Sequence, residues 1–424
     1  MLIAQRIISN VSVLSKLQQR FLVLLTLSIV CCRGRVNYLS LARVSGRNEK
    51  TFRRHFARSV NFLALHRASI DEGLGRTPPG LRIIAFDPSF LPKAGKKTSG
   101  LGWFWNGSAS RAAYGLEATV TAIVDVKSRN AMTLAIQQTI VPPKEKAPSE
   151  TTTKKATKKS STEPEELSRI DEYLRHIENV IPHLHIYERY WVVDGYFAKH
   201  KFIDKMQKLK QECITKLRVD ANMTYLYTGE KRTGRGRPKI HDGKVDWKNL
   251  RSEVFERHQC ADGTVLLTAI LYHQRLKCRL RVVVVEQSQK DGSLRRTLLA
   301  STDLNVGAEE ILEAYRARFQ VEFLIRDGKS HTGLADGQAR SKEAIEFHLN
   351  ASMFTLNCAR AEHFQRTAQN NQTTKNAFSM DSFKTIAFNE HFAEMIFSIS
   401  GLPLEMLKNH PEYHNIRNYG VIAA

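Results

Sequence analysis

The sequence ILEAYRARFQVEFLIRDGK occupies residues 311–329. It contains no proline, is rich in strong helix formers and has a single glycine, Gly328, near its end, so it predicts one helix. At about 100° per residue, four polar side chains share an arc of about 60° on that helix. These four residues are Tyr315, Arg318, Glu322 and Lys329. Apolar residues flank this polar seam on both sides, which is typical of a helix that lines the floor of a site.

A plain amphipathic helix with a charged surface network would also explain the seam. The spacing Y-x2-R-x3-E-x6-K is more specific, and it resembles the YREK signature of cut-and-paste insertion-sequence transposases of the DDE type. In that family the glutamate is the third metal-binding carboxylate of a ribonuclease-H-like nuclease. The resemblance therefore implies two earlier aspartates, each at the end of a strand.

Two aspartates meet this expectation. The apolar run LRIIAF at residues 81–86 ends at Asp87, and RYWVV at residues 189–193 ends at Asp194. Taken singly, an aspartate after a strand is more often a turn or helix-capping residue. Together with the seam, the resemblance implies that Asp87, Asp194 and Glu322 are the catalytic carboxylates. Three carboxylates can hold two Mg²⁺ or Mn²⁺ ions, which prefer oxygen ligands.

The fold expected from this resemblance is α/β, a ribonuclease-H-like core with a mixed sheet flanked by helices. A β-rich insertion interrupts the core, and an α-helical DNA-binding domain precedes it. The predicted boundaries are residues 1–78 for the helical domain, 79–219 and 301–366 for the two parts of the core, 220–300 for the insertion and 367–424 for a C-terminal helical segment. Within the core, the Lys- and Thr-rich residues 142–164 predict a disordered loop, and residues 89–110 predict a glycine- and lysine-rich loop.

The chain is strongly basic, with 64 Lys and Arg against 42 Asp and Glu and a formal charge of +22. This balance indicates a polyanionic partner, most simply nucleic acid. Residues 38–44 and 49–62 around a short turn resemble a helix-turn-helix whose second helix carries Lys50 and His55 among its cations. A basic helical hairpin that only packs on the next domain is the alternative.

Further cations are candidates for DNA contact. The run Gly236-Arg237-Pro238 resembles an AT-hook core that would enter a minor groove, although a basic loop touching phosphates explains it equally well. By resemblance, Tyr315, Arg318 and Lys329 contact phosphates near the cut. The remaining predicted DNA-binding residues are Arg53, Arg54, Arg58, Lys96, Lys97, Arg235 and Arg237. Trp103 or Trp247 could stack on a flipped base.

The function implied is a transposase that binds the terminal inverted repeats of an insertion sequence and cleaves DNA at its ends, with a hairpin intermediate. It then joins the 3′-hydroxyl ends to target DNA. The alternatives are a ribonuclease-H-like DNA nuclease that never joins strands, a catalytically inactive DNA-binding derivative and a basic RNA-associated scaffold. The expected partners are DNA and a second copy of the chain, as a homodimer on DNA, and the expected location is the cytoplasm, at the bacterial nucleoid.

The six cysteines include no CxxC pair, which favours reduced cysteines over a disulfide framework or a zinc site. The longest apolar run, residues 21–32, is too short to span a bilayer and predicts a buried helix. No membrane association is expected.

Overall fold

The structure is a computed structural model of the whole chain, and it describes residues 2–140, 168–230, 238–288, 293–369 and 378–421. Within them the α-helices are α1 (Leu2–Asn10), α2 (Lys16–Cys31), α3 (Tyr38–Ser45), α4 (Glu49–Phe56), α5 (Phe62–Leu74), α6 (Arg169–Val180), α7 (His200–Lys208), α8 (Ala308–Arg318), α9 (Gln320–His331), α10 (Lys342–Gln369), α11 (Met380–Ile399), α12 (Leu404–Lys408) and α13 (Tyr413–Arg417). The strands are β1 (Arg82–Pro92), β2 (Gly102–Asn106), β3 (Arg111–Asp125), β4 (Ala131–Gln138), β5 (Tyr190–Val193), β6 (Glu212–Leu217), β7 (Met223–Leu226), β8 (His241–Lys244), β9 (Glu256–Gln259), β10 (Val265–His273), β11 (Cys278–Ser288) and β12 (Leu294–Ser301).

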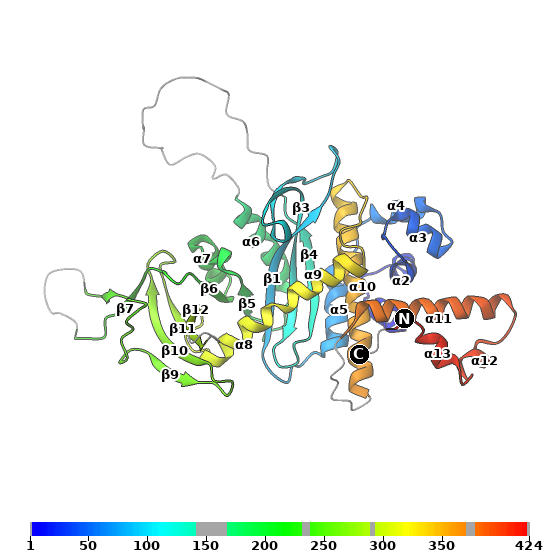
Figure 1. Cartoon of the computed structure of the whole chain (residues 1–424). Coiled ribbons are helices and arrows are strands. Elements are labelled where there is room, and N and C mark those ends of the chain that lie inside the picture. The colour runs from blue at the N-terminus through cyan, green and yellow to red at the C-terminus, as the bar shows by residue number, and fades with distance from the viewer. Residues whose placement is uncertain (1, 141–167, 231–237, 289–292, 370–377, 422–424) are drawn as a thin grey trace, which may run out of the picture.

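The architecture is mixed α/β, as predicted, with one large mixed sheet flanked by helices (Figure 1). β1 lies between β3, which is antiparallel to it, and β5, which is parallel. β6 is parallel to β5 on the other side, and β4 pairs with the outer edge of β3. All four residues of β5, YWVV, are buried, as expected for a central parallel strand covered on both faces.

Residues 220–300, predicted as a β-rich insertion, contain β7, β8, β9, β10, β11 and most of β12. They do not form a separate sheet, because β12 pairs antiparallel with β6 and continues the hydrogen bonding of the core strands. The residues of β8 and β9 are polar and largely exposed, so their sequences lack the apolar alternation that indicates a strand. The boundaries of a separate insertion remain a prediction.

Two details near Asp87 differ from the expectation. β1 does not end at Asp87 but continues through Pro88 to Pro92, paired with β3 throughout. Its pairing with β5 is limited to Ile84 and Ala85, so one edge of β1 has no partner strand at Pro88, where a missing N–H is tolerated. The predicted loop at residues 89–110 also contains β2, which pairs with the start of β3.

Residues 311–329 are not a single helix. α8 ends at Arg318 and α9 begins at Gln320, with Phe319 between them. The backbone of Phe319 stays close to helical, and its carbonyl accepts a bond from the Glu322 N–H three residues on. Both helices contact β1 and β3 on the twisted sheet (Figure 1). α8 also contacts β5, β6, β10, β11 and β12, and α9 also contacts β4.

The two faces of the sheet are distinguished by neighbouring residues of β1. Phe86 makes edge contacts with Tyr173 and His176 of α6. Asp87 contacts Arg318, the last residue of α8. Because successive side chains of a strand point to opposite faces, α6 and the α8–α9 pair cover opposite faces of the sheet.

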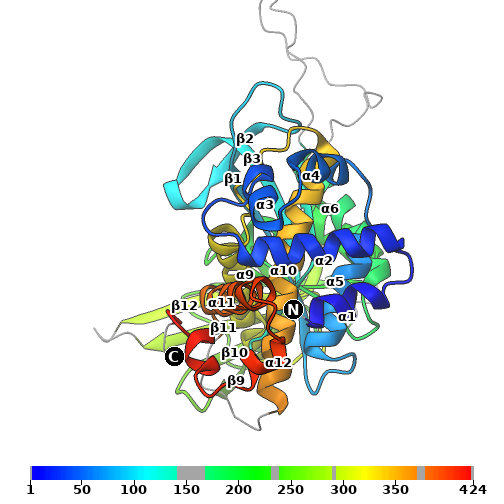
Figure 2. The same ribbon diagram turned by 90° about the vertical axis from the view of Figure 1, so that its right-hand side faces the viewer.

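The N-terminal helices pack with α10 and α11 (Figure 2). These helices lie beyond the β3–β4 edge of the sheet, on the opposite side from β7 to β12 (Figure 1). The short turn of the expected helix-turn-helix is present between α3 and α4. The second helix, however, ends at Phe56 rather than near residue 62, and α5 begins there instead. Asn61 caps α5 by accepting a bond from the Ala64 N–H, so the cap sets this boundary.

A buried ion pair holds α9 against α10. Asp327 Oδ2 accepts a bond from Arg360 Nη2 at 3.0 Å, and each side chain is 8% exposed. Gly328, expected to mark a helix end, lies inside α9 and permits the close approach of α9 to α10. A Cβ at this position would lie 2.8 Å from the Sδ atom of Met353 on α10.

Asp327→Ala is expected to lower the free energy of unfolding by about 3 kcal/mol, because it leaves the Arg360 guanidinium buried without its partner. Urea unfolding monitored by circular dichroism measures this loss. The double variant Asp327→Leu with Arg360→Met should recover much of it. Additive losses in the double variant would contradict the assignment of a coupled pair.

Among the described residues, no helix has the length and apolar composition needed to cross a membrane. All six cysteines are free thiols, in agreement with the expectation of reduced cysteines.

Candidate active site

The two predicted aspartates lie on adjacent parallel strands. Ile84 pairs with Trp191 and Ala85 with Val192, so the same register brings Asp87 level with Asp194. Asp194 follows β5 and begins a short 3₁₀ turn, where its Oδ1 accepts a bond from the Tyr196 N–H at 2.8 Å. Its backbone carbonyl accepts a second bond, at 2.9 Å, from Thr215 on β6. Asp87 within β1 and Asp194 just after β5 therefore form one acidic pair.

The third predicted carboxylate is joined to this pair by Arg318. Its Nη2 donates to Glu322 Oε1 at 2.9 Å, and its Nη1 donates to Asp87 Oδ1 at 3.3 Å. The exposed fraction is 13% for the Arg318 side chain, 22% for Asp87 and 40% for Glu322. The guanidinium thus lies between two carboxylates in a cleft that remains open to solvent on the Glu322 side.

The electrostatics of the cleft centre on Asp87. Burial raises the pKa of this carboxyl from 3.8 to about 7, Arg318 acts in the opposite direction, and the charges of Glu322 and Asp194 raise it further. The charges of Glu322 and Asp194 therefore both act on Asp87. A crowded group of acids with a single cation among them suits a further, divalent cation, which would relieve their mutual repulsion.

The other two residues of the polar seam are also near β1. Lys329 Nζ donates to Ser89 Oγ and to the Phe90 carbonyl, both at 2.9 Å, so it ties α9 to the strand that carries Asp87. The Tyr315 ring is half-buried and lies 6.0 Å from the Arg318 guanidinium. Of the apolar residues that flank the seam, Leu312, Val321 and Ile325 are buried. Phe319 is 48% exposed.

The predicted DNA-contacting cations of α4 and its C-terminal end, Arg53, Arg54 and Arg58, are all exposed. His55, which was predicted as one of the cations of the second helix, is instead buried and stacked on Phe21 with ring centroids 3.8 Å apart. His55 follows buried Phe52 by three residues on α4, so the two side chains lie on the same buried face of the helix. His55 therefore contributes to packing.

A basic groove of about 720 Å³ lies between this helical hairpin and the segments that follow β1 and α9. Its cationic lining residues are Arg53, Lys93 and Arg340. Lys93 also donates to the Gly337 carbonyl, which joins the two segments. Lys96 and Lys97 are exposed on the same loop as Lys93. The contribution of Lys93 to the groove was not predicted, although its position in a lysine-rich segment after Asp87 is a visible signal.

The remaining predicted residues have different outcomes. Arg235 and Arg237 lie outside the described residues, so their DNA contacts stay predictions. Trp103 is 67% exposed on β2, whereas Trp247 is partly buried and donates its Nε1 proton to the Ala221 carbonyl at 2.8 Å. Of these two tryptophans, Trp103 is the more exposed, and its ring makes an edge contact with Tyr114.

Comparison with known families adds to this geometry. The sequence pattern described as "DDE superfamily endonuclease" matches residues 12–267, which is more than half of the chain. The chain belongs to the DDE superfamily endonucleases. The matched region includes Asp87 and Asp194 and ends before Glu322. Nucleases of this family generally use divalent metal ions, in keeping with the acidic cleft.

One solved structure that is similar to this chain is described as a piggyBac transposase synaptic complex with hairpin DNA. The likeness covers 95% of this chain and 76% of that chain, at 10% sequence identity and a TM-score of 0.41. A likeness at this level carries no conclusion about function. No curated protein matches the sequence.

Proposed function

We propose that this DDE endonuclease is a transposase that cleaves DNA at the ends of a mobile element and joins the 3′-hydroxyl ends to target DNA. The observation that carries the proposal is the convergence of Asp87, Asp194 and Glu322 around Arg318, from two parallel strands and a helix of a mixed sheet. This arrangement supports the ribonuclease-H-like core and the YREK-type resemblance of residues 311–329.

The three carboxylates are the proposed ligands of two Mg²⁺ or Mn²⁺ ions. Among the described residues, their oxygen atoms do not form a compact group of three within 4.8 Å of one another. Two ions about 3.5–4 Å apart do not require such a group, because each carboxylate needs to reach only one of them. When bound, these ions would lower the pKa of the attacking water or hydroxyl and stabilise the leaving oxygen.

The protein residues then have distinct roles. Asp87 and Asp194 are held by the strand register and by the backbone bonds of the turn after β5, which fixes their separation before DNA binds. Arg318 neutralises the cleft in the absence of DNA and is placed to move toward a phosphate. Lys329, engaged with β1 in the free protein, positions α9, and its contact with phosphate remains part of the proposal.

DNA binding is assigned to the exposed cations of α4 and to the basic groove. From Asp87 to Pro92 the extended strand spans about 17 Å toward this groove. A duplex lying in the groove could therefore reach the acidic cleft within about half a helical turn. The helix-turn-helix would read the terminal repeats, and a second copy would hold the other end of the element.

Arg54→Ala and Arg58→Ala are each expected to weaken DNA binding and to reduce the slope of log K against log salt by about one. Fluorescence anisotropy at four salt concentrations measures the slope. Arg175→Ala is the matched control. It removes an exposed arginine of α6, which covers the opposite face of the sheet from the α8–α9 pair. Slopes unchanged in both variants would assign α4 to packing alone.

The experiment that tests the proposed function uses linear DNA ending in the inverted repeats that flank the coding segment. With Mg²⁺, the full chain should cut at the repeat ends and join the new 3′-hydroxyl ends to a supercoiled target. Cleavage without joining would favour the nuclease alternative. Binding without cleavage would favour an inactive DNA-binding derivative. A hairpin intermediate would be visible as a species of doubled length on a denaturing gel.

A further inference from the structure

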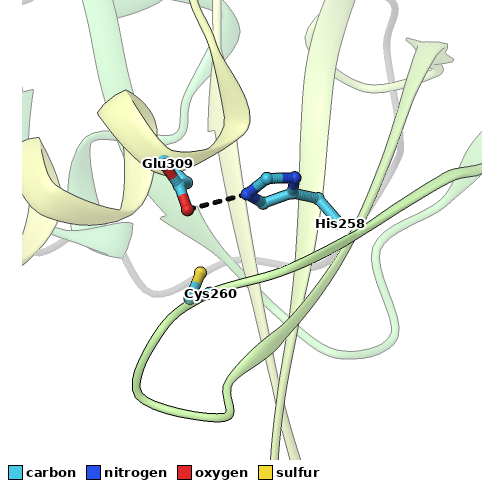
Figure 3. Close-up of side chains that lie close together, drawn as sticks. All are labelled: His258, Cys260 and Glu309. Carbon is cyan, nitrogen blue, oxygen red and sulfur yellow. Dashed lines mark hydrogen bonds and ion pairs between the residues drawn. The ribbon is translucent and has the colours of Figure 1, made fainter.

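A second group of metal-ligating side chains lies away from the acidic cleft. His258 belongs to β9, Cys260 to the turn between β9 and β10, and Glu309 to the first turn of α8 (Figure 3). One ligand atom from each residue lies within 4.8 Å of the other two, and within the described residues no other three His, Cys, Asp or Glu side chains meet this criterion. His258 Nε2 and Glu309 Oε1 are 2.7 Å apart.

The backbone around these residues is ordered by hydrogen bonds. β9 pairs with β10, with His258 opposite Leu266. The turn that follows is closed by bonds from Cys260 N to the Thr264 carbonyl at 2.9 Å and from Gly263 N to the Cys260 carbonyl at 3.0 Å. Gly263 has a φ of +80°, a conformation that favours glycine. The three side chains therefore project from fixed positions.

We propose that His258, Cys260 and Glu309 bind a transition-metal dication of the Zn²⁺ type, which ties the β9–β10 turn to α8. Imidazole, thiolate and carboxylate are the ligands that Zn²⁺ uses in proteins. A thiolate ligand disfavours Mg²⁺ and Ca²⁺, which prefer oxygen. The site is therefore distinct in chemistry from the cleft at Asp87, and the inference does not depend on the proposed function.

The distances permit binding after a small adjustment. With metal–ligand bonds of about 2.0–2.3 Å, tetrahedral ligand atoms lie about 3.3–3.8 Å apart. The side chains of His258 and Glu309 are 52% and 56% exposed, so rotation of either can close the difference. Asp262 in the same turn is already bonded to Arg316 and to the Thr264 N–H, which leaves water as the fourth ligand.

The simplest alternative is an exposed hydrogen bond between His258 and Glu309 with no metal. In that arrangement the Cys260 thiol only hydrogen-bonds to Glu309. Metal binding uses all three groups as ligands and releases the thiol proton to solvent. The metal would add a second tie between the turn and α8, beside the Arg316–Asp262 ion pair at 3.3 Å. α8 ends at Arg318, so the tie would hold the helix that reaches the acidic cleft.

The test is titration of the full, metal-free chain with Co²⁺, a spectroscopic substitute for Zn²⁺. The wild type should give one equivalent of tight binding, with a thiolate-to-cobalt absorption band that Zn²⁺ abolishes. Cys260→Ser should lose the band, and His258→Gln and Glu309→Gln should each bind Co²⁺ at least about 10-fold more weakly. The matched control Cys278→Ser removes another partly exposed cysteine and should keep the band.

Asp87→Asn should also keep the band, because the acidic cleft offers no sulfur ligand. Persistence of the thiolate band in Cys260→Ser would overturn the proposal, as would absence of any band in the wild type. Thermal unfolding provides a second readout: Zn²⁺ should raise the midpoint in the wild type and in Cys278→Ser but not in His258→Gln. An equal rise in His258→Gln would also overturn it.

Discussion

Asp87→Asn, Asp194→Asn and Glu322→Gln are each expected to reduce Mg²⁺-dependent cleavage of repeat-end DNA by about 1,000-fold or more. Each change removes a charged oxygen ligand at almost constant volume, and metal-assisted stabilisation of the transition state is worth several kcal/mol. DNA affinity should change by less than about threefold, because the exposed cations that supply it are untouched. Single-turnover cleavage of prebound DNA measures the rate.

Asp220→Asn is the matched control for these variants. Asp220 follows β6, the next parallel strand, but it is exposed and forms an ion pair with Arg218. Its substitution should leave the rate unchanged. Cleavage at the wild-type rate by any of the three variants would remove that residue from the catalytic set, and a joint loss of DNA binding would point to misfolding instead.

The second large effect is expected at Arg318. Arg318→Met leaves Asp87 and Glu322 facing each other without their shared cation, and the metal-free protein should lose about 2 kcal/mol of stability at pH 8. This figure is below the usual cost of breaking a fully buried pair because Glu322 is 40% exposed. Mg²⁺ should restore part of the loss, since a divalent ion replaces the missing positive charge.

The pH dependence of this loss follows from Asp87. Its pKa is raised in the folded protein to about 7, so between pH 4 and 7 the folded state binds more protons than the unfolded state. Stability from this group therefore falls as the pH rises through that range. Without Arg318 the pKa of Asp87 should rise further, so Arg318→Met should cost less at pH 5, where Asp87 is protonated, than at pH 8.

Urea unfolding at pH 5 and pH 8, with and without Mg²⁺, measures both effects. Arg326→Met serves as the control, because Arg326 is 65% exposed on α9 and contacts Asp327 rather than the cleft. An equal loss at the two pH values, or no recovery with Mg²⁺, would contradict the proposed arrangement of charges.

Much of the cleft could be predicted because its residues carry local signals. A polar seam at helical spacing predicted the helical part of Tyr315 to Lys329, and short apolar runs predicted β1 and β5. What local patterns could not supply is the register between those strands, which brings Asp87 level with Asp194 across more than 100 residues of chain. The resemblance to a known family supplied that expectation instead.

The wrong predictions share one cause. Contacts between segments that are distant in sequence override the local sequence signals for the ends of helices and strands. The apolar run at residues 81–86 indicated that the strand ends at Asp87, but pairing with β3 extends β1 to Pro92. Gly328 indicated a helix end, but it serves the close packing of α9 on α10. The group at Cys260 was missed because its third member, Glu309, is distant in sequence and no paired cysteines mark it.

The central claim is that Asp87, Asp194 and Glu322 share divalent ions over a scissile DNA bond. The most direct measurement is anomalous X-ray scattering from crystals of the full chain grown with repeat-end DNA and soaked in Mn²⁺. The account predicts two peaks about 3.5–4 Å apart, bordered by these three carboxylates. A cleft without any peak, in crystals where Mn²⁺ is bound elsewhere on the protein, would contradict it.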